Sequence, residues 1–111
     1  MEPAELGLVA RYVMKLLVER RFEELEQATG SVRFTADDIE GAVEDIGTAL
    51  VLPPEPSWRD LRITAVRNWP GAFNIQLTLW TARGRTSHSV ELTVHEKGGK
   101  PVIELDDIMQ R

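Results

Sequence analysis

The stretch "AFNIQLTLWTARGRTSHSVELTVH", residues 72–95, decides the fold of this 111-residue chain. Apolar and polar residues alternate on both sides of Gly84, which is typical of two half-buried strands joined by a tight turn. The same alternation continues in both directions and predicts four strands, at residues 60–68, 72–81, 86–95 and 101–107. Because the connections are short, the strands are expected to form an antiparallel meander.

The turns predict the register of the sheet. A two-residue turn at Gly98 and Gly99 sets apolar residues opposite each other on the last two strands. The expected pairs there are Val94–Ile103, Leu92–Leu105, Val90–Asp107 and His88–Met109. A turn centred on Arg83 and Gly84 predicts Leu77–Val90 and Leu79–His88, and a turn around residues 69–71 predicts Ala65–Ile75 and Ile63–Leu77.

This register gives the sheet one apolar and one polar face. The polar face has three apolar exceptions, Val66, Trp80 and Val102. The apolar face is expected to contain Leu61, Ile63, Ala65, Phe73, Ile75, Leu77, Leu79, Val90, Leu92, Val94, Ile103 and Leu105. A sheet with one dry face needs a second layer to cover that face.

The first half of the chain supplies that layer. Apolar residues three and four apart predict a helix from about residue 3 to 19, and a short helix within residues 20–30 that Phe22 and Leu25 anchor and Gly30 ends. Thr35 caps a third helix, which ends by Gly47 and the prolines of residues 53–56. We therefore predict a two-layer α+β fold, one domain over residues 1–111, with a helical half at about 3–50 and a sheet half at about 60–108.

The charge distribution argues against nucleic acid as a partner. Residues 1–56 carry five basic and twelve acidic side chains, a net charge of −7, and residues 57–111 have a net charge of +2. No dense basic stripe is present to neutralise phosphates. There is no cysteine, and the acidic, interrupted start lacks the pattern of an export signal or membrane span. We expect a cytoplasmic protein with no membrane partner and no cofactor.

Arg83 and Arg85 flank the glycine of the central turn. Two arginines beside a glycine can bind a phosphate or carboxylate, so they are candidate residues at the rim of a site for a small acidic ligand. A phosphate loop needs several glycines leading into a helix, and that pattern is absent here. The favoured interpretation is a solvated hairpin tip.

His88 and Asp107 are the candidate catalytic residues, because the predicted register places both on the apolar face as diagonal neighbours. Asp107 could orient His88 as a general base in a cavity between sheet and helices. The alternative, which we favour, is a structural polar pair at the end of the sheet. Ser87 and Ser89 point to the face opposite His88, so no nucleophilic Ser–His pair is predicted. The chain has only two histidines, so a metal site is not expected.

Trp80 is the candidate residue for partner contact, because it lies on the otherwise polar face. Shielding of its neighbours on that face is the alternative interpretation. Trp58 and Trp69 are expected to cover edges of the core.

Three helices followed by a four-stranded meander resemble the cone-shaped NTF2-like (cystatin-like) superfamily, in a shortened form. The segment "LLVERRFEELEQATG" is similar to the opening of that superfamily. The segments "LVLPPEP", "LTLWTARGRTSHSVELTV" and "IELDDI" resemble a bacterial family of small proteins of unknown function. Because that family has no assigned activity, the resemblance transfers no catalytic residue to this chain.

The leading hypothesis is a non-enzymatic, cytoplasmic binding or protein-interaction domain, with a protein partner or a second copy of itself as ligand. An immunity role fits its small size and acidity. Two alternatives stay open: a small cavity enzyme that performs acid–base chemistry through His88 and Asp107, and a passive binder of a small acidic ligand.

Overall fold

The computed structural model describes residues 1–30 and 33–110, and its helices precede its sheet. The helices are α1 (Pro3–Val18), α2 (Phe22–Ala28) and α3 (Ala36–Glu44). Strand β1 (Leu50–Val51) and the 3₁₀-helix η1 (Glu55–Asp60) then lead to β2 (Arg62–Ala65), β3 (Phe73–Thr81), β4 (Gly84–Lys97) and β5 (Lys100–Gln110). The α+β class is confirmed, but the sheet in the described part of the chain has five strands instead of four.

Local capping explains where the helices begin. At the start of α1, the side chains of Glu2 and Glu5 each contact the backbone N–H of the other residue, which forms a capping box. Pro3 is tolerated in the first turn because its missing N–H would have no partner within the helix. At α3, the Asp38 N–H donates to Thr35 Oγ1 (3.2 Å) and the Thr35 N–H donates to the Asp38 carboxylate (3.0 Å). The hydrogen bond from that backbone N–H lowers the pKa of Asp38. No helix within the described residues is both long and apolar enough to cross a membrane.

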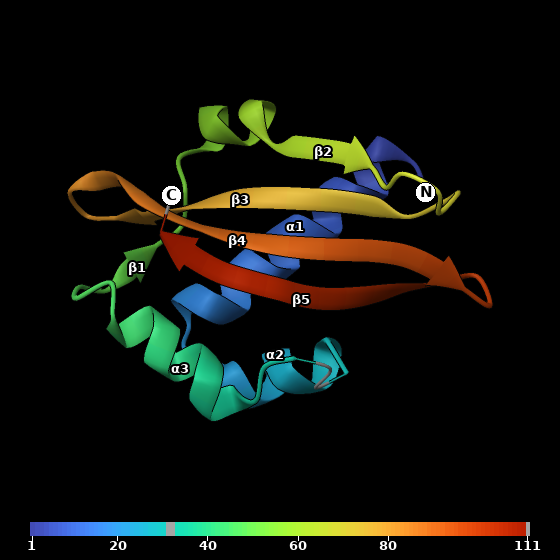
Figure 1. Ribbon diagram of the computed structural model, residues 1–111. Coiled ribbons are helices and arrows are strands. Elements are labelled where there is room, and N and C mark those ends of the chain that lie inside the picture. Colours follow the sequence, from blue (N-terminus) through green and yellow to red (C-terminus); the bar gives the residue numbers. More distant parts are fainter. Residues whose placement is uncertain (31–32, 111) are drawn as a thin grey trace.

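Strands β3, β4 and β5 form the meander, with β4 in the middle (Figure 1). Both short strands pair with the free edge of β3, β2 with residues 73–76 and β1 with residues 80–81. The fifth strand was not expected because two residues are too few to show an alternating pattern.

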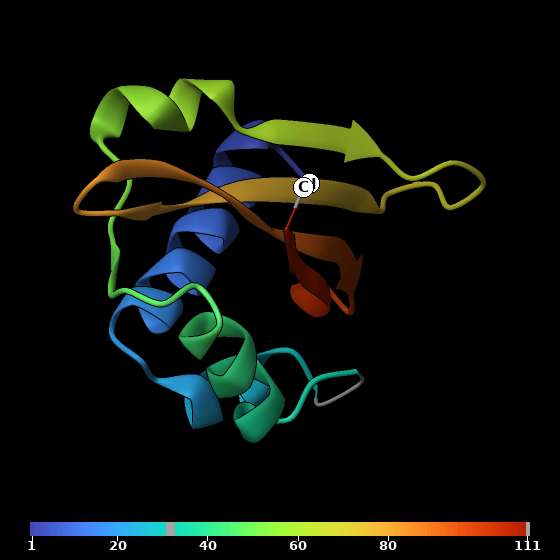
Figure 2. The ribbon, with the colours of Figure 1, turned by 60° about the vertical axis from the view of Figure 1, so that its left-hand side comes forward.

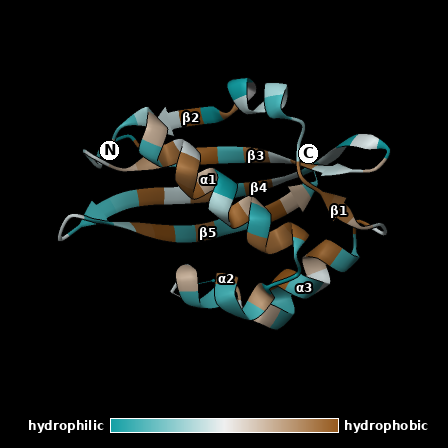
Figure 3. Cartoon of the chain, turned by 180° about the vertical axis from the view of Figure 1, so that it is seen from behind, coloured by the Kyte–Doolittle hydropathy of each residue, from teal (hydrophilic) through white to brown (hydrophobic). Residues whose placement is uncertain are grey.

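The helices form the second layer. Helix α1 crosses one face of the sheet (Figure 3), and α2 and α3 continue the helical layer beside β5 (Figures 1 and 2). The apolar sides of α1 and of the sheet bury each other, which is the main source of stability in such a layer. The core residues contributed by α1 and the three long strands are Leu6, Val9, Ala10, Val13, Met14, Leu16, Leu17, Ile75, Leu77, Leu79, Val90, Leu92, Val94, Ile103 and Leu105.

The predicted apolar face is correct for β3, β4 and β5, but the burial of the β2 residues is lower than predicted. Leu61, Ile63 and Phe73 are half-buried, and Ala65 is exposed. Helix α1 lies over the long strands, so β2 at the edge has less cover (Figure 3). Ser89, assigned to the polar face, is fully buried.

The register is confirmed around the turn at residues 98–99, where Val94 pairs with Ile103 and Leu92 with Leu105. It is also confirmed for Leu77 and Val90. The β2–β3 prediction is wrong by two residues, because Ile63 pairs with Ile75 and Ala65 with Phe73. The connection is a longer loop than the expected turn, and it is closed by the Val66 N–H, which donates to the Ala72 carbonyl (2.9 Å).

Candidate functional site

A bulge in the β3–β4 hairpin changes the predicted site. Thr78 pairs with Ser89 as expected, but Trp80 pairs with Arg85, so β4 has two extra residues between these pairs. Thr86 stabilises the irregular backbone, because its hydroxyl donates to the Leu79 carbonyl (2.7 Å) and accepts from the His88 N–H (3.1 Å). The predicted Leu79–His88 pair is therefore wrong, and bulges of this kind re-aim side chains at the ends of sheets.

The hairpin turn is also displaced. Thr81 pairs with Gly84, so the two turn residues are Ala82 and Arg83 rather than Arg83 and Gly84. Gly84 follows the turn with a φ of +114°, a backbone conformation that strongly favours glycine. Arg83 lies exposed at the tip, and Arg85 lies on the strand.

The displaced turn brings Arg85 onto Trp80. The Arg85 guanidinium carbon is 5.6 Å from the centre of the Trp80 ring, within the range of a cation–π contact. Trp80 is half-buried and Arg85 is exposed. The structure therefore brings together two of the predicted site residues and leaves Arg83 apart from them.

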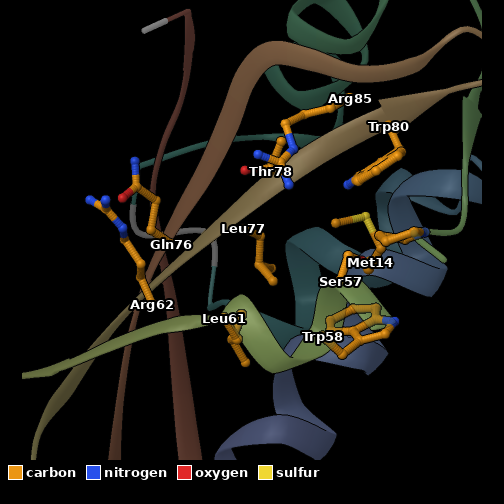
Figure 4. Close-up of a pocket in the computed structure, with 11 residues that line it drawn as sticks. Met14, Ser57, Trp58, Leu61, Arg62, Gln76, Leu77, Thr78, Trp80 and Arg85 are labelled. Atoms are coloured by element: carbon orange, nitrogen blue, oxygen red, sulfur yellow. The ribbon is translucent and has the colours of Figure 1, made fainter. Parts of the chain in front are cut away.

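These two side chains line a cleft of about 240 Å³ between β3 and η1 (Figure 4). The cleft has apolar side chains at its floor and polar side chains toward the sheet. Its lining residues are Met14, Pro53, Ser57, Trp58, Leu61, Arg62, Gln76, Leu77, Thr78, Trp80 and Arg85. Figure 4 shows Trp58, Leu61 and Met14 on one side, with Arg62 and Gln76 at one end and Arg85 with Trp80 toward the other.

The cleft lies where the edge of the sheet is interrupted. Strand β1 ends opposite Trp80 and strand β2 begins opposite Gln76, so neither strand flanks residues 77–79. Helix η1 passes this interruption and contributes Ser57 and Trp58 to the cleft. The hydroxyl of Ser57 donates to the Pro54 carbonyl (2.7 Å), which stabilises the first turn of η1.

Helix α1 holds Trp58 in place from outside the cleft. The Arg11 guanidinium carbon lies 4.6 Å from the centre of the Trp58 ring. Arg11 also makes two hydrogen bonds to the Glu55 carboxylate, at 2.8 and 3.0 Å, in the bidentate geometry that arginine favours. These hydrogen bonds lower the pKa of Glu55. The wall that carries Trp58 is thereby tied to a helix 44 residues away in sequence.

The charged side chains among the described lining residues of the cleft are basic, although the chain is acidic. No aspartate or glutamate is among its described lining residues, and both Arg62 and Arg85 are exposed. Within the described part of the chain neither of these arginines forms an ion pair. Three other arginines do, all on the helical half: Arg11 with Glu55, Arg20 with Glu40 and Glu44, and Arg21 with Glu19 and Glu24.

The predicted diagonal placement of His88 and Asp107 is wrong, as are the pairs His88–Met109 and Val90–Asp107. A second bulge, between β4 and β5, inserts Asp106, so Glu91 pairs with Asp107 and His88 with Gln110. The apolar Ile108 takes the position opposite Val90 and packs on the core. Burial of isoleucine in place of a carboxylate is the physical reason for the shift. His88 is half-buried near the end of the sheet, away from the described lining of the cleft.

Polar contacts connect the rest of the uncovered face. The Thr93 hydroxyl donates to the Asp106 carboxylate (2.5 Å), and His95 Nε2 lies 3.8 Å from Glu104 Oε2. The centres of the Trp69 and His95 rings are 4.7 Å apart, and Trp69 is 42% exposed. Among residues 1–30 and 33–110, no three His, Asp or Glu side chains are grouped so that they could hold a metal ion.

Trp58, Arg62 and Gln76 line the cleft but were not predicted as parts of a site. Trp58 was assigned to the edge of the core, which it does contact. One signal was present, since Trp58 directly follows the proline-rich segment at residues 53–56.

The fold and the cleft together define a small two-layer α+β domain with an aromatic and basic surface site. Residues 14–110 match a family described as a domain of unknown function (DUF7668), and the chain belongs to this family. Every residue that lines the cleft lies within the matched range. No curated protein and no solved structure matches the chain.

Proposed function

We propose that this domain is a non-enzymatic binding module that docks a segment of a protein partner in the cleft beside Trp80. The observation that carries the proposal is the convergence of Trp58, Trp80, Arg62 and Arg85 on one surface cleft. Tryptophan and arginine are the residue types most enriched at the energetic centres of protein interfaces.

The chemistry of the lining favours binding over catalysis. Among its described side chains, the cleft presents rings, guanidinium groups, hydroxyls and an amide, and neither an imidazole nor a carboxylate. An arginine keeps its proton at every physiological pH, so it cannot act as a general base there. The acid–base alternative required His88 beside Asp107, and the register separates them.

The size of the cleft favours a protein segment over a free small molecule. A drug-sized ligand typically occupies about 300–1,000 Å³, and this cleft measures about 240 Å³. One or two anchoring side chains of a partner fit such a volume while the rest of the partner covers the surrounding surface.

The test is capture of a partner from the native host's lysate with the tagged protein, identified by mass spectrometry. We expect a stoichiometric partner that Trp80→Ala loses and that Trp69→Ala keeps. Trp69 is the matched control, since it is an exposed tryptophan outside the cleft. Ser57→Phe fills the cleft without removing Trp80 and is also expected to lose the partner. A partner retained by both cleft variants, or no partner above background, would overturn the proposal.

The remaining expectations concern origin and setting. The order of three helices followed by a meander supports a shortened NTF2-like domain, and small size with acidic composition supports an immunity role in a bacterial cytoplasm. A toxin would be a protein partner of the kind proposed. Binding of the captured protein to the wild type, with loss of that protein's toxicity in cells, would test this role.

A further inference from the structure

We infer that the cleft recognises an extended acidic segment of the form acidic–x–apolar–x–acidic. This inference rests on the proposed function and specifies the chemistry of the partner. It follows from the charge of the cleft, from the position of its two arginines and from the direction of β3.

Two cations of the cleft, Arg62 and Arg85, favour an anionic ligand. Arg62 and Arg85 are exposed and form no ion pair within the described residues, whereas Arg11, Arg20 and Arg21 are all paired with glutamates. An acidic chain would be expected to supply partners for such groups from its own surface. A guanidinium binds a carboxylate through two parallel hydrogen bonds, so a ligand with carboxylates complements both arginines.

The sheet register gives the spacing of the two arginines along β3. Arg62 is the Cα partner of Gln76, and Arg85 is the Cα partner of Trp80. Gln76 and Trp80 are four residues apart on β3, a distance of roughly 13 Å along an extended strand, and Arg62 flanks β3 on the β2 side whereas Arg85 flanks it on the β4 side. In an extended ligand, residues i, i+2 and i+4 point the same way, so carboxylates at i and i+4 reach the two arginines.

The ligand residue at position i+2, between the two carboxylates, faces the apolar part of the cleft. Met14 and Leu77 are buried beneath it, and the rings of Trp58 and Trp80 lie at its sides (Figure 4). A leucine or a residue of similar size at i+2 would bury its side chain against them. The interruption of the sheet edge between β2 and β1 runs along β3, and so does the line of the three ligand positions. This shared direction favours an extended ligand over a helical one.

The experiment uses the ¹⁵N-labelled full chain, whose three tryptophans give separate indole N–H signals in a two-dimensional NMR spectrum. The probes are the capped peptides Glu-Ser-Leu-Ser-Glu, Gln-Ser-Leu-Ser-Gln and Glu-Ser-Ser-Ser-Glu, with free glutarate as the small-anion control. We expect the first peptide to shift the signals of Trp58 and Trp80 and to leave that of Trp69 unchanged. We expect the other probes to bind about tenfold more weakly or worse, because each lacks an element of the motif.

Charge variants distinguish this inference from the proposed function. Arg62→Gln and Arg85→Gln should each weaken the binding of the first peptide severalfold, and Arg83→Gln, at the nearby exposed tip, should not. Raising the salt from about 10 mM to about 1 M shortens the screening length from about 30 Å to about 3 Å and should also weaken binding.

Equal binding of the glutamate and glutamine peptides, equal binding of glutarate, or unshifted Trp58 and Trp80 signals would each overturn the acidic motif. Capture of a partner that depends on Trp80 but not on Arg62 or Arg85 would overturn it while leaving the proposed function intact.

Discussion

Ser89→Ala is expected to stabilise the protein, although it deletes a polar group from a well-packed sheet. Ser89 is fully buried, and its hydroxyl has no hydrogen-bond partner within the described residues. A buried polar group without a partner costs about 1–3 kcal/mol relative to the solvated group. Alanine removes this cost and leaves only a small void, so the net gain should be about 1 kcal/mol.

The gain is large enough to measure. For a chain of 111 residues, 1 kcal/mol corresponds to a rise in Tm of about 4 °C. Thermal and urea unfolding followed by circular dichroism would record it. Ser87→Ala is the matched control, because Ser87 is exposed two residues earlier on β4. That control should change the free energy of unfolding by less than about 0.5 kcal/mol.

A lower Tm for Ser89→Ala would refute the reasoning, since it would mean that the hydroxyl is hydrogen-bonded. Ser89 is the Cα partner of Thr78, which lines the cleft. The outcome therefore also reports on how β4 supports the wall of the cleft.

Three further predictions concern the floor of the cleft, its outer brace and a helix cap. Met14→Ala should lower the free energy of unfolding by about 2–5 kcal/mol in urea titrations, because the Met14 side chain of α1 is fully buried beneath the cleft. The pKa of Glu55, followed by NMR, should lie below its ordinary value of 4.5 and return toward it in Arg11→Gln. The stability from this ion pair is present above pH 4.5 and lost as the pH falls through the lowered pKa, so acidification should destabilise the wild type more than Glu55→Gln. Thr35→Ala removes the cap of α3 and should cost about 1 kcal/mol in the same urea assay.

Local pattern predicted most of the elements. The apolar spacing of α1, the Thr35 cap and the alternation of β3 and β4 each depend on neighbouring residues in sequence, and each is confirmed. Side-chain periodicity also identified the buried face of the long strands, because burial of apolar surface dominates at those positions. Strand β1 was missed because two residues have no periodicity to detect.

The site was only partly predictable, because it depends on contacts between distant segments. Trp80 and Arg85 were singled out individually, but their contact requires the bulge. The position of Trp58 depends on Arg11 and Glu55, which are 44 residues apart in sequence. No local pattern reports that η1 packs beside β3, so the cleft between them could not be predicted.

The two bulges account for both the failed and the new site assignments. An extrapolated register assumes one residue on each strand per pair, and each bulge breaks that assumption at the point where the alternation of polar and apolar residues weakens. In "TSHS" the bulge moves His88 away from Leu79 and brings Arg85 opposite Trp80. In "LDDI" it moves Asp107 opposite Glu91 and packs the half-buried Ile108 against the core. Departures from regular pairing are often found where a fold builds its functional sites. The arginine that completes the aromatic cleft reaches Trp80 because the strand pairing is irregular there, which supports the proposed binding function at this end of the sheet.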